Sequence, residues 1–171
     1  MSKIVSPRKG IAAAPAYAHI GLCVSDIERS MRFYSEGLGF VAGARIETGS
    51  ELSHFVGVPK PMTMLSQFMS LGGLNIELLG FPLSRITPRD LIPRPMSRAG
   101  VTHLSFYVHD PVATATQLVA LGGTLHEETR VDIDHFAGTD VSVSAVFCTD
   151  PDGTRIELMC FSDNFPGFTV A

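Results

Sequence analysis

The chain repeats itself, and this internal repeat constrains the fold more than any other feature of its 171 residues. The segment "HIGLCVSD", which starts at His19, returns as "HLSFYVHD", which starts at His103. The segment "IELLGF", which starts at Ile76, returns as "IELMCF", which starts at Ile156. Since both segments recur in the same order, we predict two similar structural units rather than one long fold.

Each unit has the pattern of a β-α-β-β-β module. An alternating strand opens it, and an amphipathic helix follows behind an N-cap aspartate, Asp26 or Asp110. Three further strands are expected at 41–47, 62–71 and 74–80 in the first unit and at 124–130, 141–149 and 155–161 in the second. The segment 50–57 stays unassigned. The prediction is an α+β fold of two tandem βαβββ modules with mixed sheets.

The repeat also predicts the domain boundaries. We expect an N-terminal tail (1–15), a first module (16–81), a Pro/Arg-rich linker (82–100), a second module (101–162) and a C-terminal tail (163–171). The linker carries four arginines, which either contact an anionic substrate or are simply solvated: Arg85, Arg89, Arg94 and Arg98.

Composition excludes several classes of protein. With 45% hydrophobic and 18% charged residues the chain is globular, and a net charge of −4 leaves no basic surface for nucleic acid. No apolar run approaches the roughly 18 residues of a membrane helix. The three cysteines have no CxxC spacing, which favours buried free thiols and a cytoplasmic location.

Two histidines and two glutamates occupy matching places in the repeat: His19 and His103 begin the first strands, and Glu77 and Glu157 lie in the last strands. A carboxylate between apolar strand residues is costly to bury alone. One divalent metal bound by two imidazoles and two carboxylates would satisfy all four groups, and this donor set suits Zn, Ni, Co, Mn or Fe. A lone strand histidine is more often a packed residue than a ligand, and duplication can preserve such residues after a metal is lost. The presence of four such residues at repeat-related positions favours metal ligands.

These residues, over about 16–162, resemble the vicinal oxygen chelate superfamily, which includes glyoxalase I, methylmalonyl-CoA epimerase, extradiol dioxygenases and antibiotic-resistance binding proteins. The resemblance implies paired βαβββ modules with sheets cupped around a metal. It implies ligands from the first and last strands of each module, which match His19, Glu77, His103 and Glu157. It also implies a small-molecule substrate and a homodimer in which sheets are completed across the subunit interface.

The sequence matches some branches of this superfamily better than others. "TDPDGTRIEL" resembles nickel/cobalt glyoxalase I, but Cys23 and Phe81 stand where that branch places an arginine and an asparagine for glutathione. "HIGLCV" and "IELLG" resemble methylmalonyl-CoA epimerase, whose second base matches the place of His54. That histidine is equally well read as an exposed strand or loop residue.

Extradiol dioxygenases use two histidines and one glutamate on Fe(II), so Glu77 argues against them unless it lies off the metal. They also need a second histidine and a tyrosine for oxygen and catechol. The available residues of these types are His109, His126, His135 and Tyr107. Beside His135, Phe136 would cap an apolar substrate.

The resemblance therefore predicts a metal-dependent isomerase, epimerase or lyase that transfers a proton next to a carbonyl through a metal-chelated enolate. Its substrate would be a small carbonyl compound or thioester. Glu157 is the expected base, with His54 or Glu77 on the other side of the substrate. The alternatives are an Fe(II) extradiol-type dioxygenase and a metal-free small-molecule-binding or resistance protein.

Overall fold

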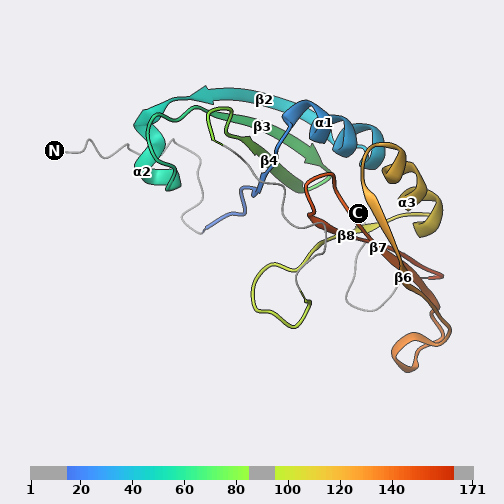
Figure 1. Cartoon of the computed structure of the whole chain (residues 1–171). Coiled ribbons are helices and arrows are strands. Elements are labelled where there is room, and N and C mark those ends of the chain that lie inside the picture. Colours follow the sequence, from blue (N-terminus) through green and yellow to red (C-terminus); the bar gives the residue numbers. More distant parts are fainter. Residues whose placement is uncertain (1–14, 85–94, 164–171) are drawn as a thin grey trace.

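The computed structural model describes residues 15–84 and 95–163, and it confirms two tandem βαβββ modules in an α+β fold (Figure 1). Each module forms one four-stranded mixed sheet. Three linker arginines (Arg85, Arg89 and Arg94) and most of both predicted tails lie outside the described residues. None of the helices in the described ranges is long and apolar enough to cross a membrane.

The first sheet has the strand order β1-β4-β3-β2, with β1 parallel to β4 and the other pairs antiparallel. Its strands are β1 (Ile20–Cys23), β2 (Val41–Thr48), β3 (Met64–Leu71) and β4 (Leu74–Gly80). Its helical elements are α1 (Ile27–Arg32), the π-helical turn η1 (Phe33–Gly37), the short 3₁₀ turn η2 (Ser50–Leu52) and α2 (Ser53–Val56). The unassigned segment 50–57 is therefore helical.

The second sheet repeats this topology as β5-β8-β7-β6. Its strands are β5 (Leu104–Tyr107), β6 (Thr124–Ile133), β7 (Val143–Thr149) and β8 (Arg155–Phe161), and its helical elements are α3 (Pro111–Ala120) and the 3₁₀ turn η3 (Phe136–Gly138). The predicted caps are confirmed, because Asp26 accepts from the Arg29 N–H at 3.0 Å and Asp110 accepts from the Ala113 N–H at 2.9 Å.

The helix-bearing faces of the two modules pack against each other. One core cluster spans both modules, and the rings of Phe40 and Phe106 meet edge to face at 6.0 Å. Figure 1 shows α1 and α3 side by side, and η1 contacts α3. At this contact Gly37 faces Leu118 so closely that an added Cβ would overlap its side chain. The helices therefore join the modules, and each sheet keeps its other face open.

A polar joint fixes this packing. The turn between β7 and β8 carries Asp150, which is buried and accepts from the Tyr34 hydroxyl at 2.9 Å and the Thr154 N–H at 2.7 Å. Asp152 in the same turn accepts from the Arg29 guanidinium at 2.9 Å. Burial raises the pKa of Asp150, and burial together with Asp150 raises the pKa of Tyr34 well above its usual range. We call this turn and its contacts to α1 and η1 the module joint.

Candidate metal centre

The first module brings His19 and Glu77 together on the open face of its sheet. Ile76 and Leu78 on β4 are fully buried in the core, so Glu77 between them points to the opposite face. His19 directly precedes β1, the neighbouring parallel strand. Its Nε2 lies 3.0 Å from Glu77 Oε2, and the side chains are 37% and 14% exposed. The predicted strand phase is therefore correct for both residues.

The second module forms the equivalent pair from His103 and Glu157, with Nε2 and Oε2 3.4 Å apart. Two hydroxyl groups support this pair. The Thr102 Oγ1 lies 2.9 Å from His103 Nδ1, and the Ser105 hydroxyl donates to Glu157 Oε2 at 2.7 Å. Oε2 of the glutamate therefore lies next to both an imidazole nitrogen and a hydroxyl group.

A phenylalanine completes each pair. Phe68 lies opposite Glu77 in the strand register and meets the His19 ring edge to face at 5.5 Å. Phe147 lies opposite Glu157 and meets the His103 ring in the same way at 5.6 Å. Sequence reasoning missed these two residues, because their repeat offset is one residue shorter than that of the glutamates.

His126 is a further polar residue on the open face of the second sheet. It is the register partner of Phe147, which is in turn the partner of Glu157. Its Nε2 is buried and has no hydrogen-bond partner among the described residues, and its Nδ1 lies 3.6 Å from Glu128 Oε1. Gly43 lies beside Phe68 in the first module, so only the second module carries this imidazole.

The donor distances fit a metal. Two ligands bound about 2.1 Å from one ion at right angles lie about 3.0 Å from each other, and the two pairs measure 3.0 and 3.4 Å. However, the described part of the chain contains no group of three or more His, Cys, Asp or Glu side chains placed to hold a metal. The four predicted ligands therefore form two half-sites of two ligands each.

The other predicted site residues lie apart from these pairs. His54 is exposed on α2, beyond the Met64 end of β3, and no contact with either pair is formed among the described residues. His109 is exposed two residues after the end of β5. His135 is left-handed, with φ 53°, and its side chain is 74% exposed.

Beyond the pairs, toward Leu79 in the first module and Met159 in the second, the open faces are largely apolar. In the first module Cys23 and Leu79 are register partners beyond Glu77, and Cys23 is exposed, so the expectation that all cysteines are buried is wrong. In the second module Tyr107, Phe136 and Phe161 form an aromatic cluster, with ring centroids 5.8 and 6.1 Å apart. Burial and nearby Glu157 raise the pKa of Tyr107.

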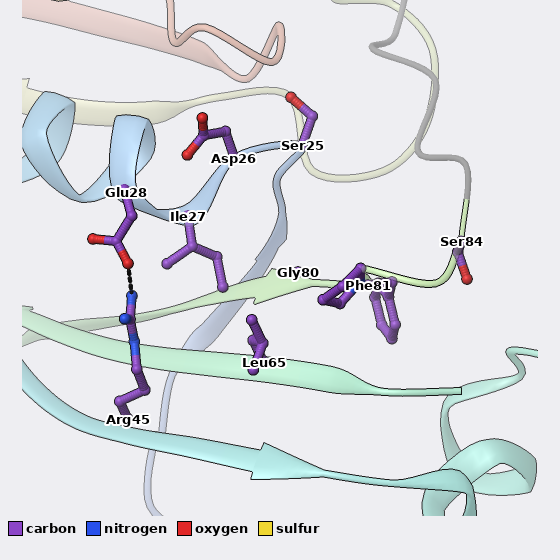
Figure 2. A pocket seen from close by; sticks show the side chains of 10 residues that line it. Ser25, Asp26, Ile27, Glu28, Arg45, Leu65, Gly80, Phe81 and Ser84 are labelled. Atoms are coloured by element: carbon purple, nitrogen blue, oxygen red, sulfur yellow. Dashed lines mark hydrogen bonds and ion pairs between the residues drawn. The ribbon is translucent and has the colours of Figure 1, made fainter. Parts of the chain in front are cut away.

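Two hollows adjoin the first module. One of about 270 Å³ opens beside His19 and is lined by Gly43, Phe68 and Asn75 among others. A larger hollow of about 490 Å³ lies on the helix-bearing face, where Figure 2 shows Glu28 and Arg45 joined by an ion pair. Among the described residues no histidine lines the larger hollow, so it is separate from the candidate metal centre.

Residues 16–158 match the family profile of the Glyoxalase/Bleomycin resistance protein/Dioxygenase superfamily. The chain belongs to this superfamily. The match covers both modules and all four candidate ligands, which confirms the resemblance found in the repeat. No curated protein sequence matches the chain.

Solved structures agree on the fold. The glyoxalase family protein from Bacillus cereus is 19% identical, with a TM-score of 0.67 over 88% of this chain and 98% of that chain. The glyoxalase family protein from Enterococcus faecalis is 21% identical, with a TM-score of 0.54 over 84% and 96%. The fosfomycin resistance protein FosX from Listeria monocytogenes, solved with Mn(II) and sulfate, is 14% identical, with a TM-score of 0.50 over 86% and 93%.

Proposed function

We propose that this superfamily member is a divalent-metal-dependent isomerase, epimerase or lyase that transfers a proton next to a carbonyl group. The observation that carries the proposal is the duplicated His–Glu pair, which puts an imidazole nitrogen and a carboxylate oxygen at ligand spacing on the open face of each module. The Mn(II) in the Listeria FosX structure, which has a similar fold, supports a divalent ion.

The ligands of this ion are His19, Glu77, His103 and Glu157. When bound, a divalent ion with open coordination positions supplies positive charge to two adjacent oxygens of a substrate and so stabilises the negative charge that develops there. The protein supplies the proton acceptor, for which Glu157 and Glu77 are the candidates, since each is a carboxylate on an open face beside a hollow or an apolar surface.

A second subunit would complete the site. The module joint holds the helix-bearing faces together within one chain, and the two His–Glu pairs stay separate half-sites. Large apolar side chains are exposed along the outer strands, among them Ile46 at 47% and Ile133 at 41%. We propose a homodimer in which the first half-site of one chain meets the second half-site of the other, burying part of this surface.

The substrate in this proposal has an uncharged body. Cys23 and Leu79 lie on one side, and the aromatic cluster of Tyr107, Phe136 and Phe161 lies on the other. Neither group carries a cation to receive the carboxylates of glutathione, and Arg155 on β8 lies on the other side of Glu157, over the Phe147 ring. A small carbonyl compound or thioester fits this surface better.

His54 is proposed as a second proton carrier. It is exposed on a short helix, so its ring is free to turn toward a substrate that a second subunit brings near. The variant His54→Gln would then slow exchange about 100-fold or more, the range typical of acid–base catalysis, while metal content stays unchanged. An unchanged exchange rate would remove His54 from the proposal.

The decisive experiment joins metal analysis with hydrogen exchange. Protein purified without added metal and then reconstituted should hold one equivalent per pair of half-sites, and NMR in D₂O should show deuterium entering the carbon next to the carbonyl of a thioester or hydroxyketone. Glu77→Gln and Glu157→Gln should each abolish this exchange. Metal-loaded protein that exchanges no proton across a broad panel would contradict the proposal, and protein that binds no metal would favour a metal-free binding protein.

One observation favours a second candidate, a ring-cleaving dioxygenase. His126 and Tyr107 share the open face with His103 and Glu157, and this combination suits oxygen and catechol chemistry on Fe(II). Oxygen consumption by the Fe(II)-loaded protein with catechols would support it. Its absence, together with proton exchange, would exclude it.

A further inference from the structure

The two half-sites differ in the groups behind their ligands. In the second module Thr102 Oγ1 lies 2.9 Å from His103 Nδ1. A histidine that binds a metal through Nε2 must carry its proton on Nδ1, and a hydroxyl oxygen accepts that N–H. The Thr102 hydroxyl can accept the Nδ1–H of the tautomer that binds a metal through Nε2, and the contact fixes the orientation of the ring.

Ser105 fixes the position of the Glu157 carboxylate, as Thr102 fixes the orientation of the His103 ring. Ser105 and Glu157 are register partners on β5 and β8, and the Ser105 hydroxyl donates to Glu157 Oε2 at 2.7 Å. The same oxygen lies 3.4 Å from His103 Nε2. A carboxylate held by a charge-assisted hydrogen bond loses little side-chain freedom when an ion binds, because it already occupies one conformation.

The first module has neither hydroxyl. Ala18 precedes His19 where Thr102 precedes His103, and Gly21 pairs with Glu77 where Ser105 pairs with Glu157. Within the described residues, the only polar partner of the Glu77 side chain is His19. Among the described residues, this half-site therefore holds its carboxylate through His19 alone, at 3.0 Å, without a supporting hydroxyl.

We propose that the second module is the anchoring half of the metal site and that Thr102 and Ser105 are its positioning residues. This inference rests on the proposed function, because it requires the four-ligand centre. It assigns tight ion retention to His103 and Glu157. It leaves Glu77 as the carboxylate with freedom to turn toward a substrate.

The test measures affinity for Zn²⁺, by competition with a chromophoric chelator, on the full chain. Thr102→Val and Ser105→Ala should each weaken binding about tenfold or more, since outer-shell partners are typically worth 10- to 100-fold. The reverse variants Ala18→Thr and Gly21→Ser should strengthen it. Gly21 accepts a side chain, because an added Cβ would lie 3.4 Å from Leu79 Cδ1, an ordinary contact.

Thr116→Ala is the matched control, since this hydroxyl donates to the Val112 carbonyl on the exposed side of α3, away from the His–Glu pairs. The Zn²⁺ affinity of this variant should equal that of wild type. Thr102→Val and Ser105→Ala proteins that are folded by circular dichroism and bind Zn²⁺ as wild type does would overturn the positioning roles. That result would leave the proposed function intact. Wild-type protein that binds no Zn²⁺, or His103→Ala and Glu157→Gln variants that bind it equally well, would overturn the four-ligand centre itself.

Discussion

The two modules share their His–Glu pair and its phenylalanine but differ in the groups around them. His19 and Glu77 lie among Ala18 and Gly21, whereas His103 and Glu157 lie among Thr102 and Ser105. The duplicated part contains the residues proposed to touch a metal. The divergent part contains the residues proposed to position those ligands. The two modules therefore differ in the surroundings of the proposed ligands and not in the ligands themselves.

The same contrast holds at the module joint. The turn between β7 and β8 contains Asp150 and Asp152, which bind α1 and η1, whereas the corresponding turn between β3 and β4 is Gly72-Gly73 and carries no side chain. A symmetric contact would need carboxylates in both turns. One polar turn instead specifies a single arrangement of the modules, and it uses the helix-bearing faces rather than the open ones.

Removing one imidazole from each half-site gives the largest expected effect. His103→Ala should weaken Zn²⁺ binding by more than about 100-fold, above the range of outer-shell changes, because it removes a prepositioned ligand. His19→Ala should weaken it less. Isothermal titration measures both, with exposed His109→Ala as the control. Equal losses from His19→Ala and His103→Ala would contradict an unequal metal site.

The variant Tyr34→Phe tests the module joint. It removes the hydroxyl that Asp150 accepts, so a buried carboxylate loses a donor, and the free energy of unfolding should fall by about 1–3 kcal/mol. Tyr17→Phe is the control, since its hydroxyl bonds to the Asn75 carbonyl at an exposed site. Urea unfolding measures both. A loss no larger than that of the control would show that the joint does not depend on this bond.

The joint also predicts a pH dependence. Burial raises the pKa of folded Asp150 above its value in the unfolded chain, so its contribution to stability is present below the unfolded pKa and is lost as pH rises through the folded pKa. Asp150→Asn should remove this pH-dependent decrease in stability. As pH rises from acidic to neutral, the Tm of wild type should therefore fall relative to the Tm of the variant.

Asp132 is the control of opposite sign. Hydrogen bonds from Ser144 and Arg130 lower its pKa, so its contribution is present above the unfolded pKa and lost as pH falls. Asp132→Asn should therefore remove the decrease in stability that Asp132 causes as pH falls, so the Tm of wild type relative to this variant should fall toward acidic pH. A parallel pH profile for wild type and Asp150→Asn would contradict the role given to burial.

The smallest expected difference concerns the phenylalanines. Arg155 lies over the Phe147 ring at 5.7 Å, whereas the corresponding residue in the first module is the uncharged Asn75. Phe147→Leu should therefore lower the free energy of unfolding by about 0.5–1 kcal/mol more than Phe68→Leu, the usual value of an exposed cation–π contact. Thermal unfolding of both variants checks this, and equal losses would exclude a contribution from the arginine.

Much of the fold was predictable because it depends on local patterns. Alternation fixed which strand face carries His19 and His103, and the Asp–helix pattern gave correct caps at Asp26 and Asp110. The segment 50–57 could not be assigned, because its two short helical turns are too brief for a periodic pattern. Cys23 was expected to be buried, but it lies on the open face of its strand. The identity of a single apolar residue does not indicate whether another element covers that face.

The sequence by itself determined that there are two modules and which histidines and glutamates recur at matching places in them, since repeat position and strand period are local properties of the chain. Only the tertiary structure decided that these side chains form two separate pairs and that Thr102 and Ser105 support one of them. Such contacts depend on β1 lying beside β4, on β5 lying beside β8, and on buried Asp150 drawing the helices together. These are pairings between residues distant in sequence, which no local pattern specifies.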